Sequence, residues 1–299
     1  MKISVIIPTC DGREKEIKKL INSLLKLRKD IFEIIVVIDK SEETRRYLTN
    51  LRKRYKMIKI LFSRERRGRC KAKNEGAKAA KGNILTFLDD DVVIRDKKYF
   101  KLLLEDFKNY KIAAVAGREI KSKEKSLMKR LAYNKVGIVN SLGEVTSNFD
   151  IFLEKPIVVQ ALPGCNFSIR KDIFKLAGGF DETYDIGTAY REETDLQIRI
   201  RKLGFSLLFD PRISVQHVER KSPTFLKKWF KWYYILNTYF FLKNFKSSFL
   251  KFCFFIYKEF IGCIVRLLIH KKPYPVIYFP EIRNGITYFI KHIKLKSVF

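Results

Sequence analysis

Short apolar runs alternate with helical patterns along the first two thirds of the chain, and this alternation limits the possible folds more than any other feature. The first run, Ile3 to Ile7, precedes a segment whose apolar residues recur every three or four positions from Ile17 to Leu25. The succession continues with expected strands at 34–38, 58–62, 84–88, 112–116, 157–162, 205–209 and 213–215, and with expected helices at 70–80, 97–109 and 192–203. Strands that alternate with helices indicate an α/β fold with a mostly parallel sheet covered on both faces. Ligands of such sheets bind beyond the carboxyl ends of the strands, so functional residues are expected there.

The composition changes near residues 222–223. The 299 residues suffice for one large α/β domain with an appendage. From Ser222 to Phe299 the chain has 14 Lys or Arg, two acidic residues and many aromatic residues. The longest uncharged run there, Trp232 to Leu242, has 11 residues, fewer than the roughly 18 to 20 of a membrane-spanning helix. We therefore expect one domain at 1–222 and a tail at 223–299 whose amphipathic helices lie on an anionic membrane surface.

The whole chain is strongly basic, with 62 Lys and Arg against 32 Asp and Glu and a formal charge of +30. This excess indicates an anionic partner such as nucleic acid, anionic lipid or a phosphorylated substrate, although a lysine-rich solvated surface explains it equally well. Five cysteines without a Cys-x-x-Cys pair favour neither a disulfide framework nor a zinc site, and they fit a reducing compartment. The first apolar run is too short for a signal peptide, so the N-terminal part is expected in the cytosol.

Three consecutive carboxylates, Asp89, Asp90 and Asp91, directly follow the expected strand 84–88. Crowding like charges costs free energy unless a cation offsets it, and carboxylate oxygens are the ligands that Mg²⁺ and Mn²⁺ prefer. The alternative is an acidic loop that caps a helix starting near Asp96. One carboxylate suffices for a cap, so three in a row favour a divalent-cation site.

The order of several motifs resembles the family 2 glycosyltransferases. Each motif is weak alone, but their order and spacing over residues 1 to about 220 are specific. The resemblance implies the GT-A fold, which is a Rossmann-like, mixed and mostly parallel sheet with helices on both faces, and inverting transfer from a nucleotide-diphosphate sugar. The segments that carry it are Pro8 to Arg13, Ile38 to Ser41, Asn74 to Gly76, Phe87 to Asp91, Leu162 to Arg170, Gly178 to Glu182 and Arg191 to Leu196.

The resemblance also implies roles for single residues of the donor site. Asp91 matches the carboxylate that ligates the metal, and Asp89 matches the one that contacts the donor ribose or a metal-bound water. Asp39 matches the acid that reads the base through its ring NH, although Ile38 stands where the family usually has a second acid. An alternative for Asp39 is the N-cap of a helix from Glu42. The implied donor-binding set is Pro8, Thr9, Asp11, Asp39, Asn74, Asp89 and Asp90.

The acidic segment from Arg191 to Asp195 places Glu193 in the position of the family's catalytic aspartate. A sugar hydroxyl attacks poorly unless a carboxylate removes its proton, so Glu193 is expected to be the general base. Because Glu is one methylene longer than Asp, Glu192 stays open as the base. The alternative is an acidic first helical turn that complements the helix dipole, and this suits Asp195 best.

Residues of three further segments are candidates for the same cleft. His217 directly follows the strand-like run from Ile213 to Gln216. Some members of the family have a histidine there that completes the metal shell, although a lone histidine is more often structural. Gly164 and Asn166 match the loop that shapes the acceptor side. Gly178-Gly179 fits either that cleft or a helix end. The basic turn 66–69 could neutralise donor phosphates, with a solvated turn as its alternative.

Taken together, the sequence predicts an inverting, Mg²⁺- or Mn²⁺-dependent glycosyltransferase domain at 1–222 that uses a UDP-, dTDP- or GDP-sugar. The tail favours a lipid-linked or cell-surface glycan precursor as acceptor and a location at the cytoplasmic face of the cell membrane. Alternatives are a polyprenyl-phosphate sugar synthase, a nucleotidyltransferase, and a non-catalytic protein that binds anionic polymers or membranes. Nucleic acid is not expected as a partner, because Asp89 to Asp91 would repel phosphate in the absence of a metal.

Overall fold

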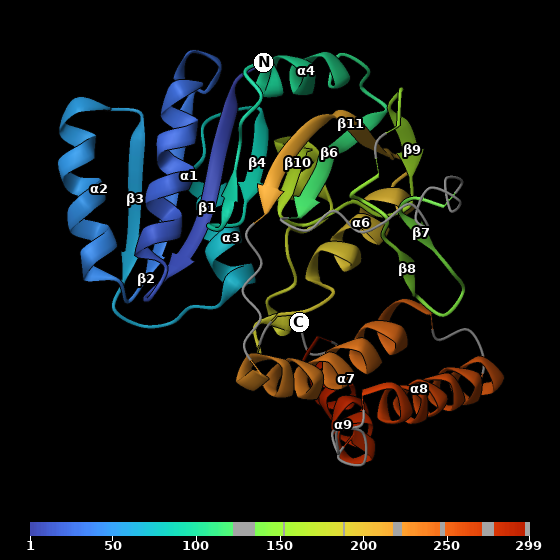
Figure 1. Cartoon of the computed structure of the whole chain (residues 1–299). Coiled ribbons are helices and arrows are strands. Elements are labelled where there is room, and N and C mark those ends of the chain that lie inside the picture. Colours follow the sequence, from blue (N-terminus) through green and yellow to red (C-terminus); the bar gives the residue numbers. More distant parts are fainter. Residues whose placement is uncertain are drawn as a thin grey trace.

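The computed structural model describes residues 1–121, 135–151, 153–187, 189–217, 223–245, 249–270 and 278–296. Figure 1 shows a twisted central sheet flanked by helices, with a separate layer of three helices against one end of it. The strands are β1 (Ile3–Cys10), β2 (Glu33–Asp39), β3 (Ile58–Ser63), β4 (Ile84–Leu88), β5 (Val92–Val93), β6 (Ile112–Lys121), β7 (Ile138–Val139), β8 (Val145–Thr146), β9 (Ile157–Val159), β10 (Asn166–Arg170) and β11 (Ser206–His217). The helices are α1 (Glu14–Lys26), α2 (Glu42–Arg54), α3 (Arg69–Ala79), α4 (Tyr99–Asp106), α5 (Lys171–Leu176), α6 (Glu192–Lys202), α7 (Pro223–Phe245), α8 (Phe249–His270) and α9 (Tyr278–Lys296).

The main sheet has the strand order β3-β2-β1-β4-β10-β6-β11-β5, and β9 also pairs with β11. The pairs β3–β2, β2–β1, β1–β4 and β6–β11 are parallel, whereas β10 runs antiparallel between β4 and β6. Strand β2 is buried at every position, as expected for a parallel strand covered on both faces. The predicted α/β class with a mostly parallel sheet is therefore confirmed.

Two apolar clusters fill the two faces of the sheet. One cluster joins the sheet to α1 and α4 through residues such as Leu20 and Phe100. The other joins it to α3, α5 and α6 through residues such as Cys70, Ile173 and Leu196. The apolar stripe predicted between Ile17 and Leu25 forms the buried side of α1. Helices on both faces leave the carboxyl edge of β1, β2 and β4 as the open edge where ligands bind in such sheets.

Strand β10 was not predicted, although its five residues alternate polar and apolar as in a half-buried strand, because it lacks the continuous apolar run of the other strands. Its polar residues are nevertheless buried, and two of them have hydrogen-bond partners inside the sheet or against it. The Ser168 hydroxyl donates to Thr86 Oγ1 at 3.0 Å, and Arg170 Nε donates to the carbonyl of Ile112 at 3.0 Å. The two strands expected at 205–209 and 213–215 form one strand, β11, with an irregularity between Asp210 and Ser214.

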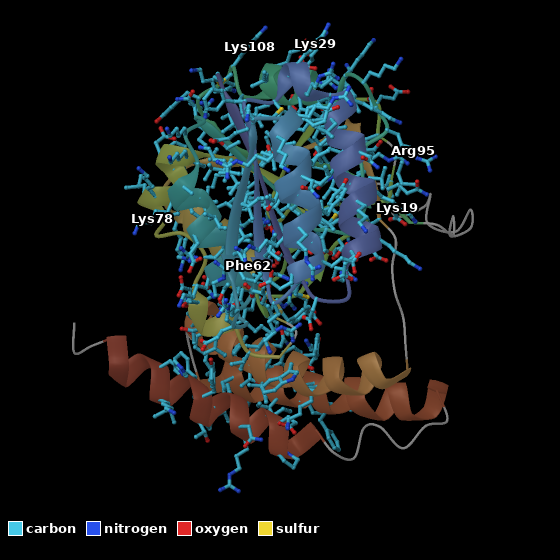
Figure 2. All side chains as sticks on the ribbon, turned by 90° about the vertical axis from the view of Figure 1, so that its left-hand side faces the viewer. Lys19, Lys29, Phe62, Lys78, Arg95 and Lys108 are labelled. Atoms are coloured by element: carbon cyan, nitrogen blue, oxygen red, sulfur yellow. The ribbon has the colours of Figure 1, made fainter. Side chains whose placement is uncertain are left out.

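The helices after residue 222 pack on the core through α7. Leu236, Tyr239 and Phe240 of α7 belong to the same apolar cluster as α3 and α6. Figure 2 shows α7, α8 and α9 as a layer beneath the core, whereas Lys29, Lys78 and Lys108 project from other sides of it. None of the helices in the described part of the chain is both long and apolar enough to cross a membrane. The domain boundary at 222–223 remains a prediction, because the tail shares its core with the first domain.

Helix α3 is capped from a distant segment of the chain. Its own N-cap position is Gly68, which offers no side chain, and the carboxylate of Asp185 accepts from the backbone N–H of Cys70 at 2.7 Å and of Lys71 at 2.8 Å. Gly68 has φ +97°, and a side chain at that position would overlap Asp185. The glycine therefore admits the acid that fixes the start of α3.

Replacing Asp185 by alanine should lower the free energy of unfolding by about 1–2 kcal/mol, because two N–H groups at the start of α3 lose their acceptor. Denaturant unfolding followed by circular dichroism measures this change. Asp185→Asn should lose less, since its amide oxygen still accepts one bond. Glu105→Ala on the exposed side of α4 serves as the control, and an equal loss in both alanine variants would contradict the capping role.

Candidate functional site

The acidic loop Asp89 to Asp91 lies between β4 and β5, at the carboxyl edge of the sheet. Strand β11 brings His217 to the same place, because it pairs antiparallel with β5 so that His217 stands opposite Val92. One carboxylate oxygen each from Asp89 and Asp91 and a ring nitrogen of His217 all lie within 4.8 Å of one another. Two carboxylates and an imidazole form a donor set that suits Mn²⁺ or Mg²⁺. The structure therefore brings together the three residues predicted to bind a metal.

The ring of His217 lies between two carboxylates. Its Nε2 is 3.1 Å from Asp91 Oδ1, and its Nδ1 is 2.6 Å from Glu119 Oε1. Burial lowers the pKa of His217, but the hydrogen bonds and charges of Asp91 and Glu119 outweigh it and raise the pKa to about 10. A metal-ligating histidine commonly donates its second ring nitrogen to a carboxylate in this way. Sequence reasoning missed Glu119, since only the pairing of β6 with β11 places it beside His217.

Asp90 has a different role from its two neighbours. It is buried, and its carboxylate accepts from the Thr9 hydroxyl at 2.7 Å and from Arg13 Nε at 2.9 Å. Arg13 Nη2 also donates to Asp91 at 2.6 Å. Burial raises the pKa of Asp90, whereas in Asp91 the hydrogen bond and charge of His217, together with Arg13, outweigh burial and lower the pKa to about 2. Arg13, which was not among the predicted site residues, thus offsets part of the charge of the acidic loop.

Glu192 and Glu193 open helix α6 and contact a buried lysine. Lys73 of α3 is 1% exposed, and its Nζ lies 2.6 Å from Glu193 Oε1 and 3.8 Å from Glu192 Oε1. Burial raises the pKa of Glu192, and the charge of Glu193 raises it further. In Glu193 the charges of Lys73 and Arg69 outweigh burial and lower the pKa. Glu193 is therefore the ionised member of the pair, and Lys73 is a second residue that the sequence did not reveal.

The loop before β10 lies directly on Glu193. A Cβ atom on Gly164 would come within 2.6 Å of Glu193 Cδ, so a side chain there would displace the carboxylate from its present position. The same loop reaches the metal-binding side, since the carbonyl of Cys165 accepts from the N–H of Asp89 at 3.1 Å. Asn166 is 1% exposed, and neither atom of its amide has a hydrogen-bond partner among the described residues. Residues 164–166 therefore contact both the acidic loop, through Asp89, and the first turn of α6, through Glu193.

The residues predicted for the nucleotide pocket surround the ends of β1 and β2. Pro8 lies in β1 opposite Val37 of β2, Thr9 bonds Asp90, and Asp11 is exposed, with its N–H 3.2 Å from the carbonyl of Asp39. Strands β1 and β2 are parallel neighbours in the sheet, so Pro8, Thr9, Asp11 and Asp39 lie at the same edge of it.

Asp39 is buried and is held by Arg67. Its two carboxylate oxygens accept from the Arg67 N–H at 2.9 Å and from Arg67 Nε at 2.7 Å. The N-cap of α2 is Ser41, whose hydroxyl accepts from the N–H of Thr44 at 3.2 Å, so the capping alternative for Asp39 is wrong. The turn 66–69 is not simply solvated either, because Arg67 is 11% exposed and also pairs with Glu75 at 2.6 Å.

Asn74 is bonded within the protein. Its amide oxygen accepts from the N–H of Phe180 at 2.9 Å, and its Nδ2 donates to the carbonyl of Phe180 at 2.9 Å. Gly178 and Gly179 have φ of +79° and +67° and end helix α5, with the N–H of Gly179 donating to the carbonyl of Phe174. Asn74 and the two glycines therefore fix the loop that follows α5.

Comparison with known proteins identifies relatives of this chain. A family model described as "Glycosyl transferase family 2" matches residues 4–177. The chain is 27% identical over 221 residues to the "Probable glycosyltransferase YdaM" of Bacillus subtilis, which covers 70% of this chain and 49% of that protein. The chain thus spans about half the length of that relative.

Two solved structures resemble the whole chain. S. aureus TarS 1–349 in complex with UDP-GlcNAc has a TM-score of 0.63 and 17% identity, with 97% of this chain and 81% of that chain covered. The mannosyltransferase PcManGT from Pyrobaculum calidifontis, in complex with GDP-Man and Mn²⁺, has a TM-score of 0.55 and 14% identity, with 98% and 87% covered. At these identities the likeness shows the fold, which is the predicted GT-A fold with additional C-terminal helices.

Replacing Glu119 by glutamine should weaken Mn²⁺ binding about ten- to a hundredfold, because His217 loses the carboxylate that orients its ring. Asp91→Asn, which alters a residue predicted to ligate the metal directly, should weaken it at least as much. Electron paramagnetic resonance of free Mn²⁺ measures both affinities without any substrate. Glu105→Gln is the control, and an unchanged affinity in the Glu119 variant would contradict this role.

Proposed function

Because the chain belongs to the glycosyl transferase family 2, we propose that it moves a sugar from a nucleotide-diphosphate donor to an acceptor hydroxyl with inversion at the anomeric carbon. The observation that carries this proposal is the arrangement of two distinct carboxylate groups around residues 164–166. One group, Asp89 and Asp91 with His217, suits a divalent cation. The other presents Glu193 as an ionised, partly exposed carboxylate beside Lys73.

The two groups are close enough to act on one donor. The negative charges of Glu193 and Asp89 both stabilise the charged forms of Lys73 and Arg69. These two cations therefore lie within electrostatic range of both a proposed metal ligand and the proposed base. Departing phosphate oxygens would meet positive charge there.

The residues divide the reaction between them. Asp89, Asp91 and His217 would hold the divalent cation, which stabilises the negative charge of the leaving nucleoside diphosphate. Thr9, Asp11 and Asp39 line the strand ends where the nucleoside would bind. Glu193 accepts the proton of the acceptor hydroxyl while the acceptor oxygen bonds to the anomeric carbon and the bond from that carbon to the phosphate oxygen breaks. No covalent sugar intermediate is needed.

A hydroxyl is favoured over a phosphate as the acceptor group. A hydroxyl needs a base, and Glu193 is the ionised carboxylate of its pair, so it has a free site for the proton. A phosphate acceptor is already anionic, and it would approach the negative charges of Glu193 and Asp89. The acceptor we propose is a hydroxyl of a lipid-linked or cell-surface glycan precursor. UDP-GlcNAc, GDP-mannose and dTDP-sugars are the donors to compare, and release of nucleoside diphosphate rather than pyrophosphate separates this reaction from nucleotidyl transfer.

Glu193→Gln should lower kcat about 10²- to 10⁴-fold with little change in donor affinity, because the base is lost and the amide keeps its shape. Glu192→Gln is the matched control. Burial raises the pKa of Glu192, so the neutral amide replaces a carboxyl group that already favours its neutral form, and kcat should fall less than about tenfold. Single-turnover transfer to a hydroxyl acceptor measures both. The reverse order of effects would assign the base to Glu192.

Lys73→Met should move the acidic limb of the kcat profile to higher pH. The cation of Lys73 lowers the pKa of Glu193, so without it burial raises that pKa and the base becomes protonated at a higher pH. Lys73→Arg keeps the charge and should keep the limb near its original position. An acidic limb that stays in place in the methionine variant would show that Lys73 does not set the ionisation of the base.

A further inference from the structure

Helix α8 turns an apolar side away from the protein and holds the charged pair Lys258 and Glu259 on the side that faces it. Lys258 Nζ pairs with Glu144 and with Glu259, both at 2.8 Å, and Glu259 is 1% exposed. Phe255 is also buried and stacks on Phe241 of α7 with ring centroids 4.2 Å apart. The inner side of α8 is thus fixed to α7 and to the core by both ion pairs and aromatic contacts.

The opposite side of α8 is a continuous apolar face, which we call the outward face. At 100° per residue these side chains fall within an arc of about 140°. Their exposed fractions are large, for example 80% for Phe249 and 57% for Phe254. The outward face consists of Phe249, Leu250, Cys253, Phe254, Tyr257, Phe260 and Ile261. A surface helix of a soluble domain normally has the reverse polarity. Contiguous exposed apolar patches of this kind mark interaction sites.

The charges around this face favour an anionic surface as its partner. Both acidic residues after position 222, Glu259 and Glu281, are buried in the helical layer. Lys231, Lys251 and Lys291 are exposed on α7, α8 and α9, so the described part of this layer presents positive charge only. A second copy of the chain is disfavoured, because each copy carries +30 and the two would repel.

We propose that the outward face of α8 inserts into the headgroup region of an anionic phospholipid membrane. Aromatic and aliphatic side chains would enter the boundary between headgroups and acyl chains, with the helix parallel to the surface. The basic residues of the layer would add attraction to anionic lipid. This binding does not depend on the proposed sugar transfer, so its test requires no substrate.

Vesicle flotation with the full chain tests the proposal. The chain should bind vesicles containing phosphatidylglycerol and bind phosphatidylcholine vesicles less. The double variant Phe254→Glu and Tyr257→Glu should weaken binding about tenfold or more, because carboxylates do not enter the apolar boundary. The matched control is Val158→Glu with Leu176→Glu. These two residues lie outside the helical layer and are 65% and 63% exposed. This control variant changes the net charge by the same amount, so it should lose only the small part of vesicle binding that is electrostatic.

Equal losses in the two double variants would overturn the proposal, because charge alone would then explain binding. Unfolding midpoints equal to that of the parent chain show that the variants fold. Sedimentation velocity tests the alternative that a second copy of the chain covers the outward face. A dimer that dissociates in the Phe254 and Tyr257 variant, with vesicle binding unchanged, would assign the outward face to a second copy and overturn the proposal.

A label on Cys253 tests insertion directly. Cys253 is an exposed thiol within the outward face. In a chain with Cys10 and Cys263 replaced by serine, a nitroxide on Cys253 should become more accessible to oxygen and less accessible to a water-soluble nickel complex when phosphatidylglycerol vesicles are added. Unchanged accessibility with vesicles bound would overturn insertion by this face.

Discussion

Repulsion among carboxylates at one edge of the sheet is the constraint on which the rest of the site depends. Asp89, Asp90 and Asp91 follow β4, and Glu192 and Glu193 open α6 nearby. Each group has its own cation. Arg13 bonds Asp90 and Asp91, and Lys73 pairs with Glu193. Without these partners the buried charges would be unfavourable, so folding and the chemistry of the site rest on the same ion pairs.

The origin of these cations explains what the sequence could and could not predict. Asp89, Asp91 and Glu193 follow strands or begin a helix, and their positions in ordered motifs make them recognisable. Lys73 lies in the middle of a lysine-rich helix, and nothing in its neighbours separates it from a solvated lysine. Its burial follows only when α3 packs against the start of α6. Glu119 is similar, because its place beside His217 comes from the register of β6 and β11.

The fold shows the same division between local pattern and long-range packing. Runs of β-branched and apolar residues predicted the parallel strands β1 to β4 correctly, because β1, β2 and β4 are almost wholly buried and even the edge strand β3 is at least partly buried. Strand β10 lacks such a run. It is specified by partners distant in sequence, such as Thr86 for the hydroxyl of Ser168. The burial of a polar side chain whose partner lies about eighty residues away cannot be inferred from its own segment.

The layer of α7, α8 and α9 contacts helix α6, whose first turn contains the proposed base Glu193, as well as facing the proposed membrane. Arg191, the N-cap of α6 with φ +76°, donates to Asn237 of α7 at 3.0 Å, and Asn237 donates to Glu259 of α8 at 3.1 Å. Lys243 of α7 pairs with Asp195 in the first turn of α6 at 2.7 Å. Deleting the layer would therefore leave Asp195 without this cation and expose the apolar core residues on which α7 packs. Changes on the outward face of α8 should therefore separate the proposed membrane binding from catalysis, because this face contacts neither α6 nor the acidic loop among the described contacts.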